Sequence, residues 1–310
     1  MAGPEGAFSH SLLVYRSPEE LVDAAARFLG DGVARDELVL AVVDAPKAEA
    51  LWEALGGDAP GVAFLDPEDW YRSPGAVIEG FHRHLASSRP PAGVRTLGEP
   101  RWNGGSAAAD REWRRIEALL NLAFADAEAH VACPYDATAV SEDVLRTALA
   151  THPWILDGDG RRPNEMYVDP VAVCRDLDQD ALPRPPGASS ELAFGAQAAE
   201  TRRLVAEECR RCGFAPHRVE DVVLAVHELV SNAIRHGGGG GVLRAWRDGE
   251  ALVCEVEDRG RGIRDPLQGY LPPAGPGTGG WGLWLARQLA DLVELRSGPT
   301  GLVVRLHARP

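Results

Sequence analysis

Short apolar segments alternate with segments of helical periodicity over the first 175 residues, and this alternation restricts the fold more than any other feature of the chain. Residues 37–43 form a continuous apolar run, as in parallel strands that are buried on both faces. Residues 18–29 carry apolar side chains on one helical face, with Ser17 as the expected N-cap. We expect further strands over residues 12–15, 61–65, 94–97 and 130–133, and further helices over residues 46–55, 74–86, 110–127 and 141–150. This order is typical of an α/β domain with a mostly parallel sheet.

The chain changes character after residue 175. Residues 176–191 are rich in Asp, Pro and Ser, which indicates a semi-rigid linker. Beyond it we expect helices over residues 196–211, 216–236 and 281–292, strands over residues 242–247, 252–257 and 302–306, and a glycine- and proline-rich stretch over residues 260–280. Helices before a β-hairpin, then a helix and a closing strand, predict an α/β sandwich. The predicted organisation is a first domain over residues 1–175, a linker over residues 176–191 and a second domain over residues 192–310.

The charged residues limit the ligands that the chain can bind. The formal net charge of -14 argues against a nucleic-acid backbone as a direct partner, because phosphate backbones are bound by basic surfaces. Of the 32 Lys and Arg residues, only Lys47 is a lysine. A Walker A P-loop needs a lysine between glycine and Ser/Thr, whereas Lys47 lies between Pro46 and Ala48. The sequence therefore contains no P-loop.

The cysteines and the apolar runs indicate the compartment. The five cysteines are an odd number, and no signal peptide precedes them, so we expect reduced thiols and a cytoplasmic location. No apolar run approaches the roughly 20 residues of a membrane helix, so we expect no membrane association. Cys209 and Cys212 form a C-x-x-C pair, but no second pair lies near them, and this does not favour zinc.

Three polar or glycine-rich segments of the second domain point to a nucleotide. Glu228 and Asn232 are four residues apart on a predicted helix and share one face, where a carboxylate can act as a base and an amide oxygen can bind Mg²⁺. Asp258 leaves a predicted strand, where it can accept a hydrogen bond from an exocyclic amine such as that of adenine. The glycines of residues 277–283 precede a helix, whose N–H groups suit phosphates. Alone, each segment would be explained by a solvated face or a turn; their order and spacing favour one site.

In these segments the sequence resembles the GHKL ATPase superfamily, and within it the RsbW/SpoIIAB anti-sigma-factor serine kinases, over residues 191–309. The resemblance implies a Bergerat α/β sandwich with Glu228 as general base, Asn232 as Mg²⁺ ligand and Asp258 as adenine contact. It also implies ATP-site or lid positions at His236, Gly260, Gly262, Thr278, Gly279, Gly280, Gly282 and Thr300. The run of five glycines at residues 237–241 departs from the family pattern and is interpreted as a flexible connection.

The resemblance implies a regulator that binds ATP and Mg²⁺, phosphorylates a serine or threonine of an anti-anti-sigma (STAS) partner, and holds a sigma factor inactive. Related kinase domains often form homodimers. Two alternatives stay open: a non-catalytic module that binds ATP and sequesters its partner, and a histidine-kinase-like ATPase that acts in trans. A histidine kinase acting in cis is disfavoured, because residues 196–211, the one helix expected between the linker and residues 216–236, contain no histidine.

The first domain resembles the MEDS sensory domain over residues 8–174. The residues that carry the resemblance are His10 with Tyr15, residues 99–102, Glu117 with Asn121, residues 133–136, and His152 with Pro153. It implies a P-loop-like α/β fold that lacks nucleotide-binding motifs and senses small molecules. We predict a sensory pocket that includes His10, Cys133, Tyr135 and His152. Cys and His are also soft metal ligands, but the segment has no close ligand pair, so we favour a small molecule over a metal.

Overall fold

The computed structural model describes residues 8–87, 93–100, 102, 106–157, 160–179, 182–187, 189–196, 198–273 and 280–310. Contacts between Cα atoms divide the chain into two compact units, and along the second half of the chain the division falls between Val173 and Cys174. The segment Ser73–Glu79 groups with the second unit. Each unit has its own sheet.

The first unit is built on a seven-stranded sheet with the order β3-β2-β4-β5-β1-β6-β7. The strands are β1 (Ser9–Tyr15), β2 (Leu38–Val42), β3 (Val62–Leu65), β4 (Val94–Gly98), β5 (Ala129–Asp136), β6 (Trp154–Asp157) and β7 (Gly160–Pro163). All neighbours pair in parallel except β6 and β7. The predicted parallel α/β fold is confirmed.

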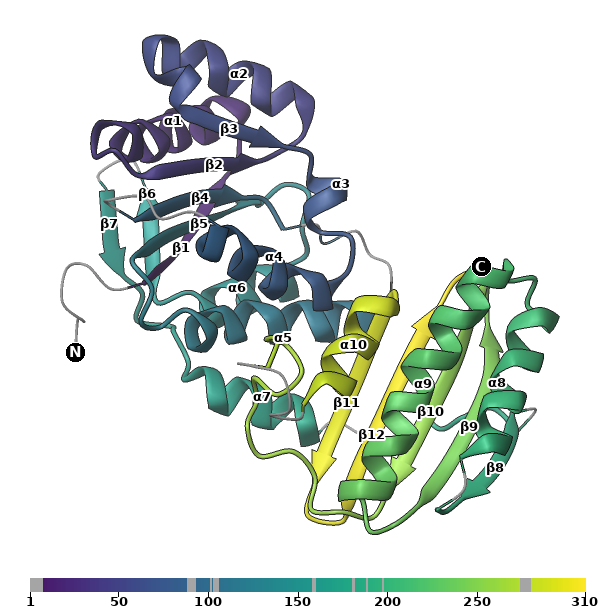
Figure 1. Cartoon of the computed structure of the whole chain (residues 1–310). Coiled ribbons are helices and arrows are strands. Elements are labelled where there is room, and N and C mark those ends of the chain that lie inside the picture. The colour runs from purple at the N-terminus through teal and green to yellow at the C-terminus, as the bar shows by residue number, and fades with distance from the viewer. Residues whose placement is uncertain are drawn as a thin grey trace. The chain divides into compact units, whose positions relative to one another are not determined.

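Helices cover both faces of this sheet. The helices along this half of the chain are α1 (Pro18–Ala34), α2 (Ala45–Leu55), the 3₁₀ helix η1 (Gly56–Gly61), α3 (Pro67–Trp70), α4 (Pro74–Ser87), α5 (Ala107–Ala123), α6 (Glu142–Thr151) and α7 (Pro170–Gln179). The division between the units falls within α4 and within α7. In Figure 1, α1 and α2 lie on one face of the sheet, and α4, α5 and α6 lie on the other. The Ser17 hydroxyl accepts a hydrogen bond from the Glu20 N–H, which confirms the predicted N-cap of α1. Burial on both faces explains the unbroken apolar run in β2.

The second unit is built on a five-stranded antiparallel sheet with the order β11-β12-β10-β9-β8. The strands are β8 (Ser190–Phe194), β9 (Gly241–Asp248), β10 (Ala251–Asp258), β11 (Leu292–Gly298) and β12 (Gly301–Ala308). The helices are α8 (Ala199–Arg211), α9 (Pro216–His236) and α10 (Trp281–Leu289), and Figure 1 shows all three on one face of the sheet. The predicted sandwich and its β9–β10 hairpin are confirmed.

Alternation along β10 separates two buried layers. Leu252, Cys254 and Val256 belong to the apolar core beneath the helices. On the other face, Glu255 is 3% exposed and pairs with Arg305 Nε at 2.6 Å and with Arg244 Nη1 at 2.9 Å. The sheet therefore carries a buried ion-pair cluster on the face opposite the helices.

Several segments differ from the sequence prediction. The helix predicted over residues 281–292 ends at Leu289, and Leu292–Gly298 forms β11. The predicted linker, residues 176–191, overlaps α7 at one end and β8 at the other. Strands β6 and β7 and helix α3 were not predicted. Strand β7 is exposed along its whole length and mostly polar, so it shows no apolar alternation.

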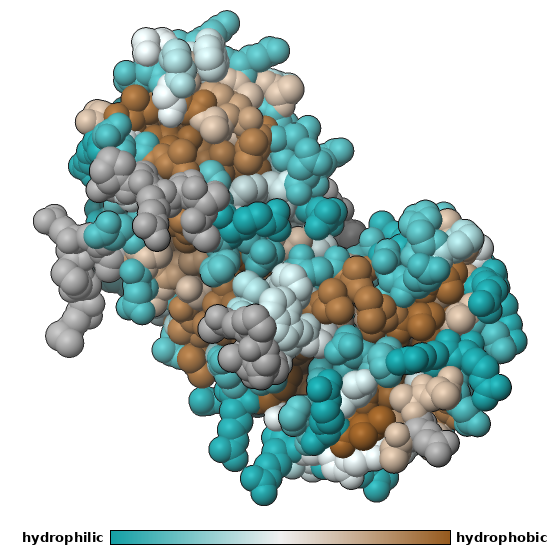
Figure 2. Space-filling view, viewed as in Figure 1, coloured by the Kyte–Doolittle hydropathy of each residue, from teal (hydrophilic) through white to brown (hydrophobic). Residues whose placement is uncertain are grey.

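Hydrophobic residues are exposed on the visible face of both units within a largely hydrophilic surface (Figure 2). The large apolar side chains that are most exposed are Trp52, Leu65, Met166, Val168, Val171, Leu224 and Trp281. Within the residues described above, no helix combines the length and the apolar character needed to cross a membrane.

Candidate functional site

A cavity of about 120 Å³ in the second unit lies where α9, the end of β10, the start of α10 and β12 meet. Its lining residues are Leu229, Asn232, His236, Val256, Asp258, Gly262, Ile263, Gln268, Gly280, Leu283, Leu302 and Val304. The structure thus brings together five of the residues predicted for an ATP site: Asn232, His236, Asp258, Gly262 and Gly280. The apolar lining was not predicted, although Val256 lies two residues before Asp258 and shares its side of the strand.

Asp258 is held rigidly at the end of β10. Its side chain is 8% exposed and accepts a hydrogen bond from the Gly260 N–H at 2.8 Å. A Cβ atom at Gly237 would lie 2.4 Å from Asp258 Cγ. A glycine is therefore required at residue 237 for the carboxylate to occupy this position.

The five-glycine run is a defined turn rather than a flexible connection. Gly238 and Gly239 have φ angles of +93° and +95°, which favour glycine. Gly240 and Gly241 lie so close to backbone that a Cβ atom would approach the Phe194 carbonyl oxygen to 2.4 Å and the Glu257 carbonyl oxygen to 2.2 Å, respectively. The run leads from α9 into β9 beside Asp258.

Glu228 and Asn232 meet the start of α10 at Gly282. A Cβ atom at Gly282 would lie 2.8 Å from Asn232 Nδ2 and 2.9 Å from Glu228 Oε2. Both side chains are partly buried on the same face of α9, as their spacing predicts. Asn232 lines the cavity and Glu228 lies next to it, so an acid and an amide adjoin the pocket that holds Asp258.

Of the other residues predicted for the ATP site, some lie at the cavity and others do not. Gly260 packs against the His236 carbonyl oxygen, 2.7 Å from where its Cβ would lie, and Gly280 adopts a φ of +87° as the residue before α10. Thr278 and Gly279 lie outside the described residues. Thr300 is exposed in the turn between β11 and β12 and does not line the cavity; Leu302 and Val304 line it instead.

The first unit has a pocket of about 330 Å³ beyond the carboxyl ends of its central strands, where ligands of open parallel sheets bind. Lys47 Nζ lies 2.5 Å from Glu99 Oε2, and the Tyr15 hydroxyl donates to Glu99 Oε1 at 2.6 Å. Burial, followed by the hydrogen bond and charge of Glu99, raises the pKa of Tyr15. Burial opposes the charge of Lys47, but the hydrogen bond and charge of Glu99 outweigh it and raise the lysine pKa. The one lysine thus neutralises an acid inside the pocket.

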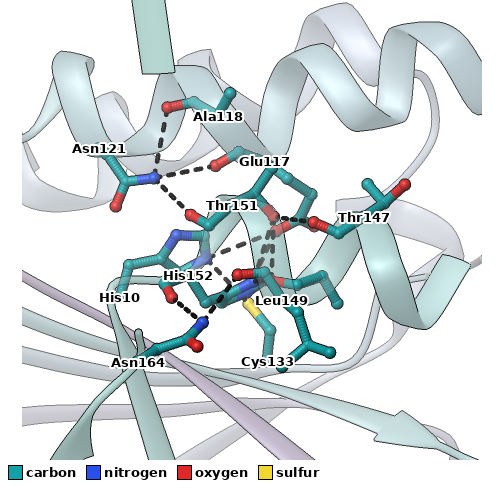
Figure 3. Close-up of polar contacts among 11 residues, drawn as sticks. His10, Glu117, Ala118, Asn121, Cys133, Thr147, Leu149, Thr151, His152 and Asn164 are labelled. Carbon is teal, nitrogen blue, oxygen red and sulfur yellow. Dashed lines mark hydrogen bonds and ion pairs between the residues drawn. The ribbon is translucent and has the colours of Figure 1, made fainter. Parts of the chain in front are cut away.

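Three of the four residues predicted for the sensory pocket form a separate buried cluster with Glu117. His10, Glu117, Cys133 and His152 each place a ligand atom within 4.8 Å of the others (Figure 3). Tyr135 instead lines the 330 Å³ pocket and packs edge-on against the His152 ring, with ring centroids 5.8 Å apart. Glu117 was not predicted as a pocket residue; it was noted only among the residues that carry the resemblance, and no local pattern indicates its partners.

Burial decides the protonation of this cluster. It lowers the pKa of His10 to about 3 and, together with the neighbouring His10, lowers that of His152 to about 3. It raises the pKa of Glu117 and of Cys133. The protein surroundings thus favour the neutral form of all four groups.

Comparison with known families identifies both halves of the chain. Residues 9–153 match MEDS, the MEthanogen/methylotroph, DcmR Sensory domain, and residues 193–308 match the histidine kinase-like ATPase domain. The chain is a MEDS domain followed by a GHKL-type ATPase domain. It is therefore a signalling protein, and its ATPase domain implies that it binds ATP.

Two solved structures share weak similarity with the chain. The RsbU and RsbW domains of Rv1364c from Mycobacterium tuberculosis are 24% identical over 41% of this chain and 33% of that one, with a TM-score of 0.30. The histidine kinase domain of the blue-light activated histidine kinase from Erythrobacter litoralis EL346 is 22% identical over 45% of this chain and 74% of that one, with a TM-score of 0.25. The chain thus spans a third of the first structure, and neither match assigns an activity. A search of curated proteins finds no match.

The C-x-x-C pair of the ATPase domain lies outside any metal-binding group found among the described residues. Cys209 is buried in α8, and Cys212 is the residue after the helix. Burial raises the pKa of Cys209 to about 12 and also raises that of Cys212. Both thiols are therefore poor nucleophiles at neutral pH.

Proposed function

We propose that the ATPase domain is a cytoplasmic protein serine/threonine kinase that phosphorylates an anti-anti-sigma (STAS) partner and holds a sigma factor inactive. The observation that carries the proposal is the convergence of Asp258, Asn232 and Gly280 on one cavity, with Glu228 beside it. These groups come from a strand end, a helix face and a helix start; an amide oxygen suits Mg²⁺, and a helix start suits phosphates.

The cavity supports ATP binding at both ends. At one end, the Asp258 carboxylate accepts from the adenine amine while apolar residues such as Val256 and Leu302 contact the ring. At the other end, the Asn232 amide oxygen fits Mg²⁺, which takes one or two protein oxygens in addition to substrate phosphates. When bound, the ion offsets the charge of the phosphates.

Glu228 is the proposed general base. Its carboxylate lies beside Asn232 and against the start of α10, so it borders the end of the cavity where the phosphates would lie. From this position it takes the proton of the partner's hydroxyl as the hydroxyl attacks the γ-phosphorus. Phosphoryl transfer depends mainly on positioning and charge stabilisation, which a fixed carboxylate and amide supply.

We propose that the MEDS domain controls this activity. Residues 1–175 would form the sensory domain, residues 176–191 the linker and residues 192–310 the kinase domain. A ligand in the first domain changes the output only if it binds two states of the protein with different affinity. The 330 Å³ pocket with Lys47 and Glu99 is the proposed place for a small-molecule ligand.

Calorimetry and a phosphorylation assay test the proposal together. The full chain should bind ATP, Mg²⁺ should strengthen the binding, and Asn232→Ala should remove that effect. With a purified STAS-domain protein, Glu228→Gln should abolish phosphoryl transfer and retain ATP binding, whereas Glu220→Gln, an exposed glutamate of the same helix, should leave both unchanged.

The product separates the alternatives. An acid-stable phosphate on the partner supports serine or threonine transfer, and an acid-labile phosphate indicates a histidine-kinase-like activity. If ATP binds but no Mg²⁺-dependent transfer occurs to any STAS protein tested, the kinase proposal is wrong and the domain acts by sequestration.

A further inference from the structure

The four residues His10, Glu117, Cys133 and His152 converge from four different elements of the MEDS domain. His10 lies on β1, Cys133 on the neighbouring strand β5, Glu117 on α5, and His152 directly after α6. All four side chains are nearly inaccessible to solvent, with exposed fractions between 0% and 4%. Polar groups of this kind are seldom buried together unless they are paired, hydrogen-bonded or coordinated to an ion.

We propose that these four residues bind one divalent transition-metal ion, with Zn²⁺ as the best match. Zn–N bonds of about 2.0–2.1 Å and Zn–S bonds of about 2.3 Å separate the ligand atoms of a tetrahedral site by about 3.3–3.8 Å. In the cluster, Glu117 Oε2 lies 3.4 Å from His10 Nε2 and 3.3 Å from His152 Nε2, and His10 Nε2 lies 3.4 Å from Cys133 Sγ. These three separations already fall within the range for a tetrahedral ion, and all four ligand atoms lie within 4.8 Å of one another.

The surroundings orient His152 as the ring of a metal-binding histidine is oriented. His152 Nδ1 donates to the Ala148 carbonyl oxygen at 2.8 Å, so Nε2 carries the lone pair and faces Glu117. The Asn164 side-chain amide donates to the His152 carbonyl oxygen at 2.7 Å and fixes the backbone at this residue. The Asn121 amide donates to the Thr151 carbonyl oxygen at 2.8 Å and joins α5 to the end of α6 (Figure 3). These bonds preset the ligands without occupying the ligand atoms.

Two of the ligand atoms are buried without a hydrogen-bond partner. These atoms are Glu117 Oε2 and His152 Nε2, and both face the centre of the cluster. A buried polar atom without a partner costs about 1–3 kcal/mol, which a coordinate bond would offset. Both atoms are lone-pair donors that point at the same space, as two ligands of one ion do.

The charge of the site and the types of ligand atom favour Zn²⁺ over Mg²⁺ and Ca²⁺. Two neutral imidazoles, one thiolate and one carboxylate carry a charge of -2, so a divalent ion makes the buried site neutral. Sulfur and imidazole ligands suit Zn²⁺ and related transition metals, whereas Mg²⁺ and Ca²⁺ take oxygen ligands. The site would therefore be independent of the Mg²⁺ proposed for the ATPase domain.

Metal loading of the full chain tests the site. The chain is treated with a chelator, loaded with Zn²⁺ or Co²⁺, freed of excess metal, and its metal content is measured by mass spectrometry. We expect one ion per chain, a thiolate-to-cobalt charge-transfer band in the Co²⁺ form, and a higher melting temperature of the MEDS domain with metal. Cys133→Ser should remove the band, and His152→Gln should weaken Zn²⁺ binding by more than about 100-fold.

Matched variants separate metal binding from folding. Cys174→Ser changes another buried cysteine outside the cluster and should keep the band and the metal content. Glu117→Gln keeps the size of the side chain but removes its negative charge, and circular dichroism reports whether each variant folds. If the loaded wild-type chain retains no ion, or if Cys133→Ser and Cys174→Ser give the same cobalt spectrum, the cluster is only a hydrogen-bonded core and the proposal is wrong. The metal content of the wild-type chain decides the question even if a variant does not fold.

Discussion

Replacement of Asp258 by Asn tests the adenine contact with little change of shape. Asp258 Oδ1 accepts from the Gly260 N–H at 2.8 Å, and an asparagine oxygen can make the same bond. The asparagine NH₂ group would then take the place of the second carboxylate oxygen and face the adenine amine, donor against donor. A hydrogen bond to a charged group contributes about 1.5–3 kcal/mol. At about 1.4 kcal/mol per tenfold change, Asp258→Asn should weaken ATP binding by about 10- to 150-fold.

Isothermal titration with ATP measures this change, and Asp265→Asn is the control. Asp265 is exposed and accepts from the N–H two residues later, Leu267, at 3.0 Å, so it makes the same local turn without lining the cavity. Its substitution should leave ATP affinity unchanged. If Asp258→Asn, correctly folded by circular dichroism, binds ATP within a factor of about two of wild type, the carboxylate does not contact adenine and the predicted orientation of the nucleotide is wrong.

Three further predictions follow from close contacts in the two domains. Gly282→Ala should lower the rate of phosphoryl transfer by about 100-fold, because the new methyl group displaces the ends of the Glu228 and Asn232 side chains. Thermal stability should change little, since only these two side-chain ends must move. An unchanged rate of transfer would contradict the proposed site. Glu255→Gln should lower the free energy of unfolding, measured in urea, by about 3 kcal/mol, because it leaves a buried arginine charge uncompensated. The control Glu200→Gln changes an exposed ion pair and should alter this free energy by less than about 0.5 kcal/mol. Burial and the charge of Arg95 lower the pKa of His130, so the stability that its neutral form contributes is present above about pH 6.5 and is lost as the pH falls. In chemical denaturation, the difference in stability between wild type and His130→Gln should therefore shrink from pH 7.5 to pH 5. A constant difference would show that this histidine does not contribute.

The residues of the proposed ATP site could be selected from the sequence because its parts are local patterns. Glu228 and Asn232 are four residues apart on one helix, and helical geometry alone places them on one face. Asp258 ends a strand whose alternation is visible in the sequence, and the glycines that follow it mark close packing. Each part could be assigned from a window of a few residues, and only their assembly required the fold.

The parts that were missed depend on contacts between distant residues. Glu117 lies on a helix whose sequence pattern gives no sign of His10, which is far away in the chain and adjacent only after the sheet forms. Strand β11 was not predicted, because the expected helix ended at residue 292 and the short segment that follows shows no clear pattern until its partner strand β12 is known. The place of Thr300 likewise depends on the tight turn into β12, which leaves its side chain exposed.

The single lysine of the chain gives the sensory domain a natural reporter. Lys47 lies in the 330 Å³ pocket, and 28% of its side chain is exposed, so a small amine-selective reagent can reach it. Such a reagent finds no other lysine side chain in the protein. A ligand that enters the pocket would shield this amine, and the rate of its modification, followed by mass spectrometry, would report occupancy. Candidate ligands could thus be screened on the unmutated full-length chain, without a partner protein and without any readout of the ATPase domain.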